Sequence, residues 1–244
     1  LLPWAIRFMP LVPVKKIPVI FLSGVLGSLL PAFLFCAAEE GIDGALAGTL
    51  NSLTPIFVII TGAMFFSMQT PANKVIGICV ALAGSVLLLF SKGHFEKPDN
   101  LLFVAYVVIA TICYGLNVNM VYRHLRDIGS LPIAAVALSL NAIPAAVVLY
   151  GTGYFSLPLR DHGILYSTGH AAMLGIGGTA IASIIFYILI KRAGAVFSSM
   201  VTYGIPIVAN LWGLWYGDEV GWKQGLCLVI ILLGVYIANR KKST

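Results

Sequence analysis

Eight long apolar runs, separated by short polar stretches, constrain this chain more than any other feature of its sequence. Each is close to the length of about 20 residues that an α-helix needs to cross a bilayer. A shorter apolar stretch, Leu1 to Val14, precedes them and is broken by prolines. The sequence therefore predicts an all-α integral membrane protein with an N-terminal stub and eight complete transmembrane helices, at residues 17–38, 43–67, 73–91, 100–122, 132–151, 170–190, 194–216 and 221–239.

The composition places the lipid bilayer around the chain. Hydrophobic residues make up 59% of the sequence and charged residues only 10%, whereas soluble domains carry about 25% charged residues. The net charge of +6 is explained by basic residues in the loops of a membrane protein, so we expect no nucleic-acid partner. The histidines and cysteines show no ligand spacing, and we expect no metal and no cofactor.

The basic residues predict an orientation. Alternate loops fall into two groups, one with eleven basic residues and one with only Lys92, Lys97, Arg160 and Lys223. Basic residues collect on the cytoplasmic side, which predicts a cytoplasmic C-terminus with a basic tail at 240–244 and a location in the cytoplasmic membrane. The outward side then carries Glu39, Glu40, Asp43 and Asp218–Glu219, together with a longer loop at 152–169. The cytoplasmic group comprises Arg7, Lys15, Lys16, Lys74, Arg123, Arg126, Lys191, Arg192, Arg240, Lys241 and Lys242.

An internal repeat relates two proline-containing spans. An offset of 151 residues places Pro55 on Pro206 and Gly62 on Gly213, and an offset of 150 places Gly84 on Gly234. The related spans are five crossings apart, so they run through the membrane in opposite directions. This pattern predicts an inverted-topology repeat, which is common among secondary transporters. Because proline and glycine are frequent in membrane helices, chance identity is the alternative.

Several of these segments resemble the EamA family of the drug/metabolite transporter superfamily. The matching residues are Asn51-Ser-Leu-Thr-Pro55, Gly77 and Gly84, Ile112 to Asn117 with Arg123, Ala193-Gly-Ala195 to Pro206, Asp218–Glu219 and Gly234-Val-Tyr236. The resemblance implies ten helices in two five-helix repeats. Residues 1–92 would then form an incomplete first repeat that lacks about two N-terminal helices, and residues 99–239 a second repeat. In the first repeat, Ser67–Met68 stands where the family usually has an acidic residue.

Uncharged polar residues in the spans are the candidates for a substrate pathway. Prolines within a helix leave carbonyls without an amide donor, and such groups must be satisfied by a neighbour or line a wet cavity. Pro55 and Pro206 are therefore the candidate helix hinges. The candidate pathway residues are Asn51, Ser52, Thr54, Tyr114, Asn117, Ser199, Thr202, Tyr203 and Asn210. Close helix packing through serine and threonine is the alternative reading. Tyr114 and Asn117, together with Asn141, are weaker candidates than the residues of the two proline spans, and Asn119 is expected near the membrane interface.

These features predict a secondary transporter that moves a small molecule by alternating access between two inverted repeats. Because the spans carry no Lys or Arg cluster for a phosphate, we expect amino-acid-like, uncharged or amphipathic solutes. Export is one direction left open, and a homodimer is an open alternative to a monomer. A lipid-modifying membrane enzyme is a second hypothesis, but no set of paired carboxylates, metal ligands or histidine–acid pairs is evident. A channel or a non-transporting scaffold is the third.

Overall fold

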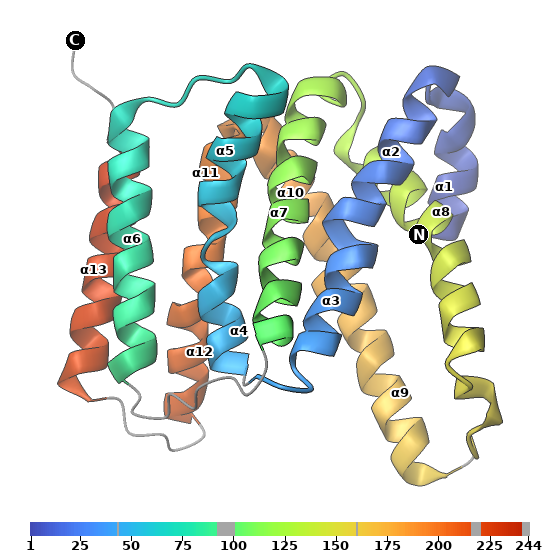
Figure 1. Ribbon diagram of the computed structural model, residues 1–244. Helices are drawn as coiled ribbons and strands as arrows, with labels where there is room; N and C mark the ends of the chain where they lie inside the picture. The colour runs from blue at the N-terminus through green and yellow to red at the C-terminus, as the bar shows by residue number, and fades with distance from the viewer. Residues whose placement is uncertain (43, 92–100, 160, 216–220, 241–244) are drawn as a thin grey trace. The chain divides into compact units, whose positions relative to one another are not determined.

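The computed structural model describes residues 1–42, 44–91, 101–159, 161–215 and 221–240, and this part of the chain is helical without any strand (Figure 1). Among the described residues, six helices are long and apolar enough to cross a membrane: Val14–Ala38, Leu46–Phe66, Leu101–His124, Ser130–Gly151, His162–Ala193 and Trp222–Asn239. Two shorter apolar helices, Ala72–Leu88 and Ala195–Val208, overlap the predicted spans at 73–91 and 194–216. The prediction of a multi-pass helical membrane protein is confirmed.

The chain forms two compact units, and each is described by itself. Unit 1 comprises Leu1–Leu29 and Met120–Ala193. In it α8 packs against α1, α2 and α10. Its elements are α1 (Leu2–Phe8), η1 (Met9–Leu11), η2 (Val14–Lys16), α2 (Ile17–Gly24), the π-helix η3 (Val25–Leu29), α8 (Ser130–Gly151), η4 (Tyr154–Ser156), α9 (His162–Leu174), the π-helix η5 (Gly175–Ile181) and α10 (Ala182–Ala193).

Unit 2 comprises Leu30–Asn119 and Gly194–Thr244. The helix α7 (Leu101–His124) begins in this unit and continues into unit 1. The other elements of unit 2 are α3 (Leu30–Ala38), α4 (Gly44–Asn51), α5 (Thr54–Phe66), α6 (Ala72–Ser91), α11 (Ala195–Ser199), the 3-10 helix η6 (Met200–Tyr203), α12 (Gly204–Trp215) and α13 (Trp222–Asn239).

Basic residues meet around the turn that follows α7. The Lys16 ammonium donates to the carbonyl of His124 and lies 3.4 Å from Asp127. The Lys191 ammonium donates to the carbonyl of Ile128. These contacts bring the basic loops at 15–16, 123–126 and 191–192 to one end of unit 1, as the grouping by alternate loops requires. Of the acidic residues expected on the other side, Asp43 and Asp218–Glu219 lie outside the described residues.

The predicted loop at 152–169 is wrong in its second half. The helix α9 begins at His162, because the Asp161 carboxylate accepts a hydrogen bond from the backbone N–H of Gly163 at 2.8 Å and caps the first turn. Together with η5 and α10 it forms one apolar helix of 32 residues. Hydropathy alone placed the start too late, because the first turns of α9 are only moderately apolar.

Both proline spans are interrupted one turn before their proline. The first breaks at Ser52–Leu53, between α4 and α5, so that Pro55 lies in the first turn of α5. The second passes through the 3-10 turn η6 before α12, which contains Pro206. A proline is tolerated in the first turn of a helix, where its missing N–H has no partner to lose. The irregularity precedes each proline: it is a two-residue turn before Pro55 and a 3-10 turn within a continuous helix before Pro206.

Two π-helical segments lie 150 residues apart. η3 spans Val25–Leu29 and η5 spans Gly175–Ile181, so adding 150 to the first residue of η3 gives the first residue of η5. Such wide turns are rare and often occur at functional sites. They fall in the spans that the internal repeat places in equivalent positions, although the sequence pattern did not predict them.

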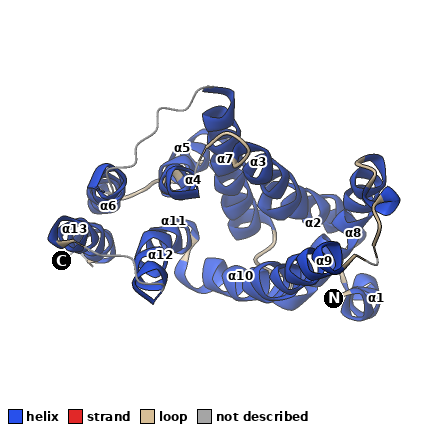
Figure 2. Ribbon diagram, turned by 90° about the horizontal axis from the view of Figure 1, so that it is seen from below, coloured by secondary structure: helices blue, strands red, loops and turns tan. Residues whose placement is uncertain are grey.

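The helices α6 and α13 form the most extensive contact in unit 2 and lie side by side in Figures 1 and 2. A Cβ added to Gly77 would meet the backbone of Gly234 and Ala238, and one added to Gly234 would meet the backbone of Gly77 and Ala81. Gly84 likewise faces Ile231. Residue numbers rise along α6 as they fall along α13, so the two helices are antiparallel. Small residues let membrane helices approach this closely.

Candidate substrate pathway

The predicted pathway and hinge residues all belong to unit 2. There the two interrupted proline spans pack against each other. The helix α4 contacts α12, and α5 contacts α11 and η6, so the two spans run antiparallel. Figure 2 shows them end-on, with α4 and α5 above α11 and α12. The structure thus brings together the two polar segments that the sequence places 151 residues apart.

In the first proline span, the polar groups gather at the break. The Thr54 hydroxyl donates to the Asn51 side-chain oxygen at 3.1 Å, and Pro55 supplies no N–H to the carbonyl of Asn51. Asn51 is half-buried, whereas Ser52 is fully buried with its hydroxyl 3.5 Å from the carbonyl of Gly48. Asn51 is therefore the more accessible of these two side chains.

In the second proline span, the hydroxyl groups bond to backbone carbonyls. Ser199 donates to Val196 at 2.8 Å, and Thr202 donates to Ser199 at 2.9 Å. Tyr203 is 1% exposed and donates to the carbonyl of Ile78 on α6 at 3.0 Å. This geometry makes Tyr203 an anchor between helices. Asn210 belongs to α12, but its side chain lies outside the described part.

The helix α7 supplies the third polar segment. Tyr114 is half-buried and stacks on Phe35, with ring centroids 6.3 Å apart. Asn117 is 3% exposed, and its side-chain oxygen has no hydrogen-bond partner. The backbone of α7 approaches α5 at Gly115, where an added Cβ would lie 2.9 Å from the carbonyl carbon of Phe57. The side-chain oxygen of Asn117 is thus a buried acceptor without a partner.

Asn119 is a polar residue whose contacts the sequence did not predict. The sequence suggests a depth near the membrane interface, and the structure shows that the side chain is fully buried among helices. Its amide nitrogen donates to the carbonyl of Val58 at 2.8 Å and lies 2.9 Å from the Thr61 hydroxyl. An amide inside an apolar span is costly unless it forms hydrogen bonds. This rule could have indicated from the sequence that Asn119 bonds to a neighbouring helix.

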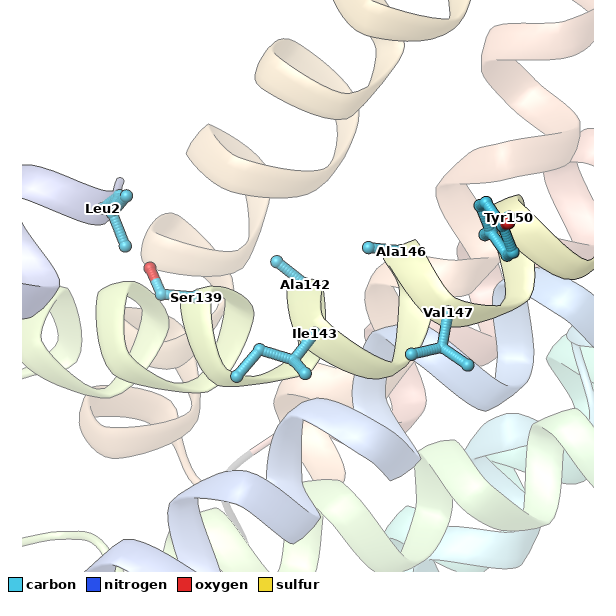
Figure 3. A pocket seen from close by; sticks show the side chains of 7 residues that line it. All are labelled: Leu2, Ser139, Ala142, Ile143, Ala146, Val147 and Tyr150. Atoms are coloured by element: carbon cyan, nitrogen blue, oxygen red, sulfur yellow. The ribbon is translucent and has the colours of Figure 1, made fainter. Parts of the chain in front are cut away.

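Two grooves on unit 1 are apolar and contain none of these residues. One has a volume of about 590 Å³ and is shown in Figure 3, where Leu2 faces a row of side chains on α8. The other has a volume of about 390 Å³ and lies among α1, α8, η5 and α10. Their lining suits lipid contact. The first is lined by Leu2, Ser139, Ala142, Ile143, Ala146, Val147 and Tyr150.

The helices and their apolar surfaces together define a multi-pass membrane protein. Within the described residues, no three His, Cys, Asp or Glu side chains come close enough to hold a metal ion. The described polar groups of the proline spans and of the matching face of α7 are hydroxyls and amides.

The sequence matches the model of the EamA-like transporter family at residues 1–90 and 101–240, and the chain belongs to this family. An "Uncharacterized transporter" of Archaeoglobus fulgidus is 26% identical over 93% of this chain and 79% of its own length. A "Probable terminal-alkyne amino-acid exporter" of Streptantibioticus cattleyicolor is 23% identical, with 93% and 74% covered. The family and these relatives are transporters, not enzymes, so the hypothesis of a lipid-modifying enzyme is set aside.

Two further comparisons bear on substrate and fold. A "Probable sugar phosphate/phosphate translocator" of Arabidopsis thaliana is 26% identical over 97% of this chain and 59% of its own length. The relatives thus carry different substrate names. A solved crystal structure superposes with a TM-score of 0.72 at 19% identity, covering 93% of this chain and 77% of the other. This likeness shows that the fold is shared.

Proposed function

We propose that the protein is a secondary transporter that moves small metabolites by alternating access between two inverted repeats. The observation that carries this proposal is the reciprocal packing of α6 and α13. Gly84 faces Ile231, while Gly234 faces Ala81. Adding 150 to the residue number relates Gly84 to Gly234 and Ala81 to Ile231. The contact of Gly84 with Ile231 is therefore equivalent to that of Gly234 with Ala81, with the roles of the two helices exchanged.

A local two-fold axis in the membrane plane relates two equivalent helices that run antiparallel, and it makes the contacts between them reciprocal. The proline spans support the same axis, because they also pack antiparallel and are interrupted one turn before Pro55 and Pro206. The π segments at Val25 and Gly175 add a third pair at the same offset. Three pairs of features at offsets of 150 or 151 residues are difficult to reconcile with chance identity of prolines and glycines.

This proposal includes eight crossings in the present chain, arranged as two members of a five-plus-five repeat. Residues 1–92 belong to the first repeat, 99–239 to the second and 240–244 to a basic tail. We place the C-terminus on the cytoplasmic side of the cytoplasmic membrane, on the strength of the unequal distribution of basic residues. Protection of the C-terminal tail from an impermeant protease in right-side-out cells would test this orientation.

The substrate class that the polar groups support is an amino-acid-like or uncharged solute. A phosphate-bearing solute calls for Arg or Lys donors, and the described pathway segments of unit 2 carry neither. The acceptor on Asn117 is buried without a partner in this conformation, and it would suit an ammonium or hydroxyl donor once the pathway opens to it. We assign the pathway to Asn51, Tyr114 and Asn117, with Ser52, Thr54, Ser199, Thr202, Tyr203 and Asn210 around them and Pro55 and Pro206 as hinges.

Counterflow in proteoliposomes tests the function and the substrate class together. Purified protein is reconstituted, and exchange of radiolabelled L-threonine, L-phenylalanine and D-glucose 6-phosphate is compared. We expect exchange of an amino acid and none of the sugar phosphate. Exchange of the phosphate alone would refute the substrate class, and chemical change of a solute without flux would refute transport.

Matched variants test the pathway. Asn51→Leu and Asn117→Leu each remove amide groups and are expected to lower the exchange rate about tenfold, the effect of losing one hydrogen bond. Asn239→Leu is the control, because Asn239 is exposed at the end of α13 and bonds only within its helix, to Val235. Equal rates in all three variants would remove Asn51 and Asn117 from the pathway.

A further inference from the structure

Two buried asparagines make the same kind of contact in different parts of the molecule. In unit 2, Asn119 on α7 donates to the carbonyl of Val58 on α5 at 2.8 Å and to the carbonyl of Gly115 in its own helix at 3.1 Å. It rests on Gly62, where an added Cβ would lie 3.2 Å from its side-chain oxygen. The glycine gives the amide room to reach the neighbouring backbone.

In unit 1, Asn141 on α8 repeats this arrangement. It donates to the carbonyl of Phe21 on α2 at 3.1 Å and to the carbonyl of Ala137 in its own helix at 2.8 Å. A Cβ added to Gly24 of α2 would overlap the Asn141 amide. We call each arrangement of asparagine, facing glycine and two carbonyls an asparagine clamp.

The carbonyls fix the orientation of both amides. A backbone carbonyl can only accept, so the nitrogen of each asparagine must face it and the oxygen must point away. The side-chain oxygens of Asn119 and Asn141 are buried without a hydrogen-bond partner. A buried acceptor without a partner costs about 1 to 3 kcal/mol. Each clamp therefore includes this unfavourable free energy, which a purely apolar contact would avoid.

Each clamp holds a helical turn beside an irregular segment. Val58 lies one turn beyond the break at Ser52–Leu53 that precedes α5. Gly24 is the residue immediately before the π segment Val25–Leu29. The boundary between the two compact units also falls at the end of that π segment, between Leu29 and Leu30. Irregular helical segments are places where a helix changes direction most easily.

The clamps also join the two stretches of the sequence that the family model matches. In one clamp α5, from residues 1–90, is tied to α7, from residues 101–240, and in the other α2 is tied to α8 in the same way. Any movement of one repeat against the other must either break a clamp or bend the helix beyond it. Breaking would expose two more unpaired groups in an apolar setting.

We infer that Asn119 and Asn141 are positioning residues of the transport cycle, which hold α5 and α2 against the second repeat. Because α5 and α2 are held, the helices that move are those on the other side of each irregular segment. These are α4, before the turn at Ser52–Leu53, and α3, after the π segment Val25–Leu29. This inference rests on the proposed transport function for its cycle, but the clamps themselves are tested without any substrate.

Hydrogen–deuterium exchange of the protein in nanodiscs tests the first clamp, using Asn119→Ala, Gly62→Ala and the double variant. Interhelical hydrogen bonds in membrane proteins are worth about 0.6 to 1.7 kcal/mol. We therefore expect amides of residues 52–66 to exchange about three- to twentyfold faster in either single variant. The double variant should exchange no faster than the faster single one, because both changes break the same contact.

The control is Gly225→Ala on α13, where an added Cβ has nothing within 4 Å; its exchange at residues 52–66 should equal that of the unmodified protein. Asn141→Ala and Gly24→Ala extend the test to residues 17–29. Additive effects in the double variant, or faster exchange spread evenly over α6 and α13, would overturn the inference. Both outcomes would mean that the asparagines only add general stability.

Transport kinetics separate positioning from solute binding. In counterflow of the amino acid that the unmodified protein exchanges, Asn119→Ala should change the maximal rate several-fold and leave the half-saturating concentration unchanged. A changed half-saturating concentration with an unchanged maximal rate would place Asn119 in the binding site instead. If the unmodified protein exchanges no solute, the proposed function fails, while the exchange measurements still decide whether the clamps are coupled contacts.

Discussion

The hydroxyl of Tyr203 lies 3.0 Å from the backbone carbonyl of Ile78 and ties η6 to α6. Tyr203 is 1% exposed, so the ring fills space between the helices while the hydroxyl satisfies a single acceptor. The bond also fixes the 3-10 turn that interrupts the second proline span. This contact leads to the first prediction, because it gives a residue chosen for the pathway a structural role as well.

Tyr203→Phe should lower the free energy of unfolding by about 0.6 to 1.7 kcal/mol, the value of one hydrogen bond between membrane helices. Thermal unfolding in detergent measures the change. Tyr236→Phe is the matched control, because Tyr236 is 65% exposed on α13 and should have little effect. Equal unfolding temperatures for the two variants would contradict the anchoring role.

Gly234→Ala should destabilise the contact between α6 and α13. The new methyl group would meet the backbone of Gly77 and Ala81, which cannot turn aside as a flexible side chain would. Overpacking of this kind costs about 1 to 3 kcal/mol. Gly225→Ala on the same helix has open space and should leave stability unchanged or slightly raised, as measured by unfolding of both variants in the same detergent. A neutral Gly234→Ala would show that the two helices can separate without loss.

Asp161→Ala should loosen the first turns of α9. The Asp161 carboxylate accepts from the N–H of Gly163 at 2.8 Å, and removing an N-cap of this kind costs about 1 kcal/mol. Hydrogen exchange at residues 162–168 should accelerate by about fivefold. Asp161→Asn keeps a good capping residue and should behave like the unmodified protein; acceleration in both variants would point to charge instead of capping.

Lys16→Met should cost more stability than Asp127→Asn. The Lys16–Asp127 pair is open to solvent, with side chains 31% and 63% exposed, and exposed ion pairs contribute about 0 to 1 kcal/mol. Lys16 also donates to the carbonyl of His124 at the end of α7, and Lys16→Met removes this donor as well. Unfolding of both variants is measured at low salt and at molar salt. High salt should remove only the contribution of the ion pair, so the contribution of the hydrogen bond to His124 should remain. A larger loss of stability for Asp127→Asn would show that the hydrogen bond from Lys16 to His124 is not the main contribution.

The sequence was a good guide to the spans, for a physical reason. A bilayer leaves backbone groups no partner except their own helix, so an apolar run of sufficient length has essentially one structure. The run predicted at 132–151 is α8, Ser130–Gly151, and the run at 221–239 is α13, Trp222–Asn239. Their bounds differ from the prediction by two residues or fewer at each end.

The sequence was a poorer guide to the polar residues, because the contacts of a polar side chain depend on the rotation of its helix. The sequence did not predict that Asn119 donates to the backbone of α5 or that Tyr203 donates to the backbone of α6. Neither role can be read from the periodicity of a span that is apolar on every side. The start of α9 was missed because hydropathy does not register a cap such as Asp161.

The helix formed by α9, η5 and α10 is longer than the membrane is thick. Its 32 residues, His162–Ala193, extend over about 48 Å at 1.5 Å per residue, against a hydrocarbon core of about 30 Å. The helix must therefore tilt in the bilayer or extend beyond it. The exposed turns around Tyr166 lie at the end far from Lys191, so a fluorophore attached there would report whether this end lies in lipid or in water.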